Sequence, residues 1–432
     1  TGADHSRDAT DVLVEIKTSN EPGVYILADF HPFLDEPVNV RLLKDIALRQ
    51  EQLRHTVIMI SHELKTPPEL ERMCVRFGMS VPSRDELMQL VMDETREWSR
   101  SRNGQNVRTN RTMLNALVEN LQGIPEGDAR RLTQGALQDG AISDHDLKPI
   151  MEAKFKLLNQ DGVLFFEYDV GPLSEVGGLG ALKKWLEVRR PVFTGELSNS
   201  GLDKPKGVLL LGVQGCGKSL AAKAIAGSWN VPLLRLDFGS LYNKFHGETE
   251  RNLRDSLRTA QIMEPCVLWI DEIEKGIGSD GMDGGTSRRV LGTLLTWMAE
   301  NKKRVFIVAT ANHIESLPPE LLRKGRVDEI FFVDLPDAPT RAHILNIHLD
   351  KRDLDRQSID VARVAEACAG FSGSEIEQLV VGSLYSSHAR SKAVTTGALL
   401  EESARTRPLS VVMAEQIDHL RQWASTRTVP AQ

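Results

Sequence analysis

The sequence lacks the features that mark membrane-spanning, disulfide-rich and nucleic-acid-coating proteins. Its apolar runs stay well short of the ~18 residues of a membrane span, and no signal peptide is recognisable. Its four cysteines are scattered without a Cys-x-x-Cys pair, as expected of reduced thiols in a cytoplasmic protein. Its 53 Lys and Arg are outnumbered by 60 Asp and Glu, which gives a net charge of −7. We therefore expect no membrane span, a cytoplasmic location and no general nucleic-acid binding, since nucleic-acid binders usually present a basic face.

What remains is the composition of an ordinary globular protein. The 432 residues are 41% hydrophobic and 26% charged, which suits two to four domains with cores of their own. The chain starts at Thr1 without a methionine, which leaves an N-terminal truncation open.

The most specific motif is Gly212-Val-Gln-Gly-Cys-Gly-Lys218-Ser219, which fits a phosphate-binding loop at every fixed position. It follows the apolar run 207–211, an expected strand, and precedes the alanine-rich run 220–226, an expected helix, so a chance glycine turn is disfavoured. We expect Lys218, in a solvated loop, to contact the β- and γ-phosphates, and Ser219 to coordinate Mg²⁺. The candidate phosphate contacts are Gly215, Cys216, Gly217, Lys218, Ser219 and Leu220.

Two further strands are expected to end in polar residues. The apolar run 267–270 precedes Asp271 and Glu272, which we predict to hold Mg²⁺ and to polarise the attacking water, respectively. The run 304–309 leads to Asn312, which could orient that water. The alternatives are a solvated acidic turn and an asparagine with ordinary turn chemistry.

Two arginines follow a Pro-Pro turn, Arg323 and Arg326 in Leu-Leu-Arg-Lys-Gly-Arg. The carboxylates Asp271 and Glu272 do not need these arginines as ion-pair partners. They are either surface arginines or arginine fingers that reach the γ-phosphate bound by a neighbouring subunit.

Together these motifs resemble the AAA ATPases, in the clade that carries Arg-x-Gly-Arg. The resemblance implies ATP, Mg²⁺, a homo-oligomeric ring with six subunits as the family expectation, and a three-layer αβα P-loop module with a helical lid. Val176 and Gly177 resemble the entry to the adenine pocket, and Gly373 and Ser374 the start of the lid sensor. The chain departs from the family at 213–214, which lack the usual proline, and at Glu274, where aspartate is common.

Phe245 lies in Lys-Phe-His-Gly, between the phosphate loop and the acidic strand. In AAA unfoldases an element at this place points into the central pore, so the resemblance implies that Phe245 grips a protein client. Packing of Phe245 in the core is the alternative.

The first half of the chain repeats the second without its chemistry. Residues 66–72 parallel 317–323, with Arg72 matching Arg323, and expected strands at 24–29 and 56–60 precede them. The catalytic positions are replaced by Phe30, Ser61 and Val75, so we expect no nucleotide site there. His62 resembles the phosphoacceptor of a sensor histidine kinase or a zinc-protease ligand. The strand before His62 argues against the kinase, and Thr66 in place of a second histidine argues against the protease.

This arrangement resembles one AAA family in particular, named after a hypothetical chloroplast open reading frame (the Ycf type). We predict a degenerate AAA-like α/β domain at 1–100, its helical lid-like segment at 101–150 and a linker at 151–170. The AAA core should occupy 171–336 and the helical lid 337–432.

The resulting hypothesis is Mg²⁺-dependent ATP hydrolysis in a ring, coupled to remodelling of an unidentified protein client. One alternative is a nucleotide-gated regulatory scaffold with slow turnover, which would need no aromatic at Phe245. The other is a DNA-acting AAA+ loader, which the acidic balance of the chain disfavours.

Overall fold

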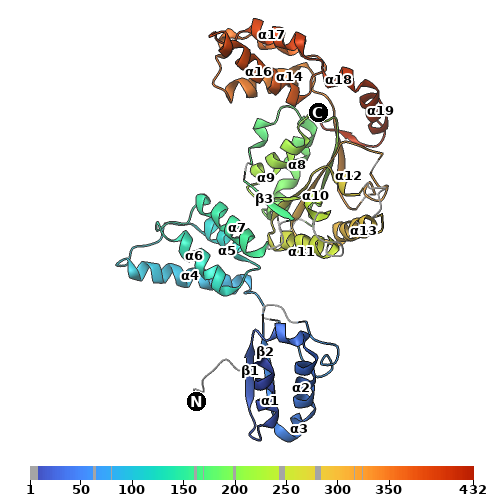
Figure 1. The fold of residues 1–432 in the computed structure, drawn as a ribbon. Helices are drawn as coiled ribbons and strands as arrows, with labels where there is room; N and C mark the ends of the chain where they lie inside the picture. Colours follow the sequence, from blue (N-terminus) through green and yellow to red (C-terminus); the bar gives the residue numbers. More distant parts are fainter. Residues whose placement is uncertain are drawn as a thin grey trace. The chain divides into compact units, whose positions relative to one another are not determined.

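The computed structural model describes residues 8–61, 65–78, 80–159, 163–168, 170–197, 201–242, 249–277, 284–315, 317–323 and 325–432. The chain divides into two compact units, 1–80 and 81–432 (Figure 1).

The first unit is a small α/β layer. Its elements are α1 (Ala9–Thr18), β1 (Val24–Ala28), η1 (His31–Asp35), α2 (Pro37–Leu48), α3 (Gln50–Leu53) and β2 (Thr56–Ile60). The strands pair in parallel, Val24 opposite Thr56, and confirm the strands predicted at 24–29 and 56–60. Leu13, Leu43 and the inward side chains of both strands share one hydrophobic cluster with α1 and α2.

The second unit begins with a group of helices, α4 (Arg84–Ser101), α5 (Arg111–Leu121), α6 (Glu126–Ala136) and α7 (Asp144–Leu158). Ser83 and Glu86 form a capping box that starts α4. Leu87, Leu117 and Ile150 share one core, so α4 belongs with α5 and α7. The helical segment thus begins near residue 84 and ends at 158, whereas the sequence placed its bounds at 101 and 150.

The central sheet of the second unit has, within the described residues, the strand order β3-β5-β6-β7-β4-β8-β9. All neighbours are parallel except β3 and β5. Three strands, β4, β6 and β7, are buried at every residue, because parallel strands are covered by helices on both faces. The strands are β3 (Leu164–Glu167), β4 (Gly207–Gly212), β5 (Leu233–Leu236), β6 (Cys266–Ile270), β7 (Val305–Ala311), β8 (Glu329–Val333) and β9 (Val429–Pro430).

Helices cover both faces of this sheet, which gives the predicted three-layer αβα module. On one face pack α8 (Gly180–Thr194) and α9 (Lys218–Trp229). On the other pack α11 (Thr249–Ile262) and α13 (Gly284–Glu300). The short element η2 (Leu173–Glu175) precedes α8, α10 (Phe238–Tyr242) precedes α11, and α12 (Ile273–Ile277) precedes α13.

A separate helical lid follows β8. It comprises α14 (Ala338–Asp350), η3 (Arg356–Ser358), α15 (Val361–Ala367), α16 (Gly373–Ala389) and α17 (Thr396–Arg405) around a core of its own. The lid ends earlier than the predicted residue 432, since α18 (Leu409–Val412) and α19 (Ala414–Ala424) lead back to the sheet. There the Ala431 N–H donates to the Phe332 carbonyl beside β9 (2.9 Å). Among the described residues, no helix is both long and apolar enough to span a membrane.

Candidate nucleotide site

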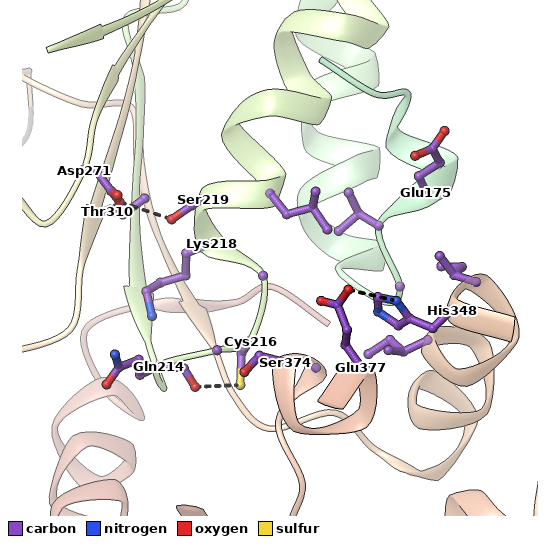
Figure 2. Close-up of a pocket in the computed structure, with 18 of the residues that line it drawn as sticks. Glu175, Gln214, Cys216, Lys218, Ser219, Asp271, Thr310, His348, Ser374 and Glu377 are labelled. Carbon is purple, nitrogen blue, oxygen red and sulfur yellow. Dashed lines mark hydrogen bonds and ion pairs between the residues drawn. The ribbon is translucent and has the colours of Figure 1, made fainter. Parts of the chain in front are cut away.

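A cleft of about 440 Å³ lies between the phosphate loop, the carboxyl ends of β6 and β7, and the lid. This volume is within the usual range of small-molecule sites. Figure 2 shows Ser219 and Asp271 on one side of the cleft and His348, Ser374 and Glu377 of the lid on the other. The cleft is lined by all of the predicted nucleotide contacts and two of the predicted catalytic residues: Val176, Gly177, Gly215, Cys216, Gly217, Lys218, Ser219, Leu220, Asp271, Glu272, Asn312, Gly373 and Ser374.

The phosphate loop depends on its glycines. Gly215 and Gly217 have φ angles of +76° and +89°, in the left-handed region that side chains rarely adopt. A Cβ on Gly215 would also lie 2.2 Å from the Ser374 Oγ of the lid. The backbone can therefore turn its N–H groups into the cleft only because these positions lack side chains.

Lys218 is buried, with 6% of its surface exposed, which corrects the expectation of a solvated loop. Its Nζ donates to the carbonyls of Gly212 (2.8 Å) and Val213 (2.9 Å) at the end of β4. Burial lowers the pKa of Lys218 to about 8, although the nearby carboxylates of Glu274 and Asp271 act in the opposite direction. A desolvated ammonium of this kind gains strongly from an anionic phosphate.

Three hydroxyl and carboxylate groups meet beside Lys218. Ser219 Oγ donates to Asp271 Oδ1 (3.2 Å), and Thr310 Oγ1 donates to the same oxygen (2.6 Å). Hard oxygen ligands of this type fit Mg²⁺, which usually binds one carboxylate together with substrate phosphates and waters. Thr310 was not predicted to be a site residue, because its place beside Asp271 depends on the register between β6 and β7.

Glu272 is held at the edge of the cleft by two partners. Asn312 Nδ2 donates to Glu272 Oε1 (3.0 Å), and Lys275 forms an ion pair with Glu272. Glu272 itself has a φ of +46°, an uncommon backbone conformation for a non-glycine residue. The buried Glu274 accepts the Asn312 backbone N–H (2.8 Å) and so fixes the tip of β7.

The lid closes the cleft from the other side. Ser374 N–H, in the first turn of α16, donates to the Gly215 carbonyl (3.0 Å). A Cβ on Gly177 would lie 2.4 Å from Ile344 of α14, so only glycine fits there. No pattern in the sequence pointed to three further lining residues, His348, Lys351 and Glu377. Burial lowers the pKa of His348.

The two candidate finger arginines do not line the cleft. Arg323 is exposed, whereas Arg326 is partly buried. Within the described residues, the buried Nη1 of Arg326 finds no hydrogen-bond acceptor. Phe245, the predicted pore residue, lies outside the residues that the structure describes.

Comparisons with known proteins match each part of the chain. Residues 208–335 fit the model of the ATPase family associated with various cellular activities (AAA). Residues 1–79 and 85–161 fit the N-terminal and second domains of SpoVK-like AAA ATPases. In the solved structures, the FIGL-1 AAA domain shares the fold, with a TM-score of 0.53 at 23% identity over 63% of this chain and 95% of that one.

Similar full-length relatives extend the match over both units. The proteasome-activating nucleotidase of Aeropyrum pernix is 31% identical over 84% of this chain and 86% of its own. The uncharacterized AAA domain-containing protein ycf46 of Pyropia yezoensis is 37% identical over 95% of this chain and 83% of its own. With its phosphate loop, acidic strand and lid arranged around one cleft, the chain belongs to the ycf46-type family of AAA domain-containing proteins.

Proposed function

We propose that this protein hydrolyses ATP with Mg²⁺ in a homo-oligomeric ring and uses the cycle to remodel a protein client. The observation that carries the proposal is the division of the chemistry between two places. The cleft holds the groups proposed to bind the nucleotide and to activate the attacking water, whereas Arg323 and Arg326 lie outside it. Arg323 is exposed and Arg326 is only partly buried, so both can face another chain. A neighbouring subunit's ATP would be their partner, through a heterologous interface that closes into a ring.

Each group in the cleft has a task that fits its surroundings. Lys218 holds the β- and γ-phosphates, because its lost hydration is replaced by phosphate oxygens. Ser219 and Asp271 would hold Mg²⁺, which neutralises charge on the phosphates when bound. Glu272 takes a proton from the attacking water, and Asn312, bonded to Glu272, orients both.

Single substitutions and mixtures of variants test this assignment. Glu272→Gln should bind ATP normally and turn over at least ~100-fold more slowly, the scale of a lost general base. Arg326→Ala should also bind ATP and fail to hydrolyse it. Mixing Arg326→Ala with Lys218→Ala should restore activity, since one variant supplies the loop and the other the arginine. No restoration, in mixtures shown by native mass spectrometry to contain both variants, would contradict a shared site.

The client is best sought with the stalled enzyme. Glu272→Gln should keep ATP bound and therefore retain its partner through purification. Lys218→Ala, which should not bind ATP, is the matched control. A protein that is enriched equally by both variants would not be a nucleotide-dependent client.

A nucleotide-gated scaffold is the second candidate, and the ion pair between Glu272 and Lys275 favours it. The Lys275 ammonium occupies Oε2 of Glu272, an oxygen that would otherwise accept the proton of the attacking water, which suits slow turnover. Lys275→Met should then raise the basal turnover several-fold at an unchanged ATP affinity. Unchanged turnover would mean that Lys275 does not restrain Glu272.

We further propose that the first unit, residues 1–80, is a degenerate AAA-like domain without a nucleotide site. Phe30 is buried in the core of the first unit and cannot polarise water. Ser61 Oγ is hydrogen-bonded to His31 Nδ1 (2.8 Å). Binding should saturate at one nucleotide per chain. A photo-crosslinked ATP analogue attached near Asp29 would contradict this.

A further inference from the structure

The segment just before β4 is tied through one side chain to the arginine loop, of which the structure describes Arg323, Gly325 and Arg326. Lys206 Nζ donates to the carbonyl of Gly325 (2.7 Å), which lies between the two candidate finger arginines. The same Nζ donates to the carbonyl of Ala299 (3.2 Å) in the last turn of α13. Lys206 thus holds the arginine loop against the end of a helix, where a cation is favoured by the exposed carbonyls.

A second set of hydrogen bonds joins the start of β4 to Asp328, which lies two residues beyond Arg326. Asp328 Oδ2 accepts the backbone N–H groups of Lys206 (2.7 Å) and Gly207 (3.0 Å). The Asp328 N–H donates in turn to the Gly207 carbonyl (2.9 Å). The base of the arginine loop is therefore fixed to the start of β4, and Lys206 adds a tether at its centre.

The centre of the loop needs such a tether. Gly325 has a φ of +103°, a conformation open to glycine and not to other residues, so its own backbone gives little restraint. Among the described residues, nothing lies within 4 Å of the position that a Cβ on Gly325 would take. The bond from Lys206 therefore limits where the two arginines point.

Strand β4 connects this tether to the nucleotide. Its first residue, Gly207, follows Lys206, and its last, Gly212, opens the phosphate loop and accepts a bond from Lys218. The strand is buried at every residue between two neighbours, β7 and β8. It is therefore a stiff connection between the nucleotide of one subunit and the arginines offered to the next.

We propose that Lys206 is a positioning residue, which orients Arg323 and Arg326 for hydrolysis in the adjacent subunit. The inference rests on the proposed function, because it assumes that the arginines act between chains. A subunit with a substituted Lys206 should therefore bind its own ATP normally. Its arginines should fail to support hydrolysis in the adjacent subunit.

The chain offers a matched control in Lys204. It lies two residues upstream of Lys206, is exposed, and donates to the Lys302 carbonyl (3.3 Å), away from the arginine loop. Lys206→Met should keep the ATP affinity within about twofold and lose at least tenfold in kcat, which corresponds to about 1.4 kcal/mol of barrier. Lys204→Met should keep both constants, and Lys206→Arg, which retains a cationic donor, should keep most of the kcat.

Mixtures of variants separate a positioning role from a structural one. Lys206→Met mixed with Lys218→Ala should regain activity, because an intact arginine loop then meets an intact phosphate loop. Lys206→Met mixed with Arg326→Ala should stay inactive, because both variants are poor donors. Native mass spectrometry and melting temperatures verify that mixed assemblies form and that each variant is folded.

Three results would overturn the inference: wild-type kcat in Lys206→Met, the reverse pattern of restoration, or a large fall in melting temperature with restoration by neither partner. The mixture of Arg326→Ala with Lys218→Ala serves as the reference. It shows whether a negative result refutes the role of Lys206 or the proposed function. If that reference mixture stays inactive, or if no assembly forms, the shared site itself is refuted. If it regains activity, only the role of Lys206 is in question.

Discussion

Replacing Lys218 with methionine should abolish ATP binding and yet stabilise the protein in the absence of nucleotide. The reason is that the free protein keeps an ammonium group buried, hydrogen-bonded to the Gly212 and Val213 carbonyls. Burial lowers the pKa of Lys218 from 10.5 to about 8. Between these two values the unfolded chain binds the proton more tightly than the folded one. The free energy of unfolding therefore rises with pH from about 8 to about 10.5, and the full cost of the charge is felt below pH 8.

The size of the effect follows from that shift. The lowered pKa corresponds to roughly 3 kcal/mol of destabilisation at neutral pH. Methionine removes this cost and also two hydrogen bonds, each worth about 1 kcal/mol. The net expectation for Lys218→Met is a gain of about 1 kcal/mol, or about 1–2 °C in melting temperature for a chain of this length.

Thermal unfolding with and without ATP provides the assay. Without nucleotide, Lys218→Met should melt above the wild type. With ATP at about 100 times its Kd, the wild type alone gains about 2.7 kcal/mol, so the order should reverse. Lys223→Met, on the same helix α9 and outside the cleft, should keep the ATP-induced shift. A variant that melts well below the wild type without ATP would refute the reasoning about burial of the charge.

Three further predictions concern the loop, the helices and the pore. Gly215→Ala should lower ATP affinity at least ~tenfold, since its Cβ would lie 2.2 Å from Ser374 Oγ. Adding Ser374→Ala should restore part of the affinity. Unchanged ATP binding by calorimetry would exclude the clash. Burial lowers the pKa of Lys154 to about 8, and its Nζ donates to the Ile262 carbonyl (2.8 Å). In Lys154→Met the rise in unfolding free energy between about pH 8 and 10, measured by urea titration, should therefore be smaller than in the wild type. An unchanged rise would exclude Lys154 as its source. If Phe245 grips a client, Phe245→Ala should keep basal turnover within about twofold and lose client-stimulated turnover. If the protein is a scaffold, Phe245→Ala should change neither turnover. If Phe245 packs in the core, the variant should lose ~3–5 kcal/mol of stability.

Motifs with fixed spacing allowed most of the nucleotide cleft to be predicted from the sequence. The phosphate loop, Asp271 and Asn312 each follow a buried strand, and parallel strands place their carboxyl ends together, so local patterns sufficed. The role of Thr310 depends on the register between β6 and β7, which no local pattern encodes.

The contacts made by distant segments could not be predicted. The partners of Lys218 and Lys206 are backbone carbonyls, which every residue carries, so the sequence gives no sign of them. The return of α19 and β9 to the sheet depends on burial of Ile417, Leu420 and Ala431 against elements some hundred residues earlier. Helix α4 crosses the predicted boundary at residue 100 because Leu87 and Val91 pack with α5, a tertiary preference that composition does not reveal.

In the proposed ring, hydrolysis needs two chains whereas ATP binding needs one. Turnover per chain and ATP affinity should be measured over a dilution series, with the assembly state followed by analytical ultracentrifugation. We predict that turnover per chain falls in the same concentration range in which the assembly dissociates, while ATP affinity stays constant. Turnover per chain that remains constant down to a population of single chains would contradict the account.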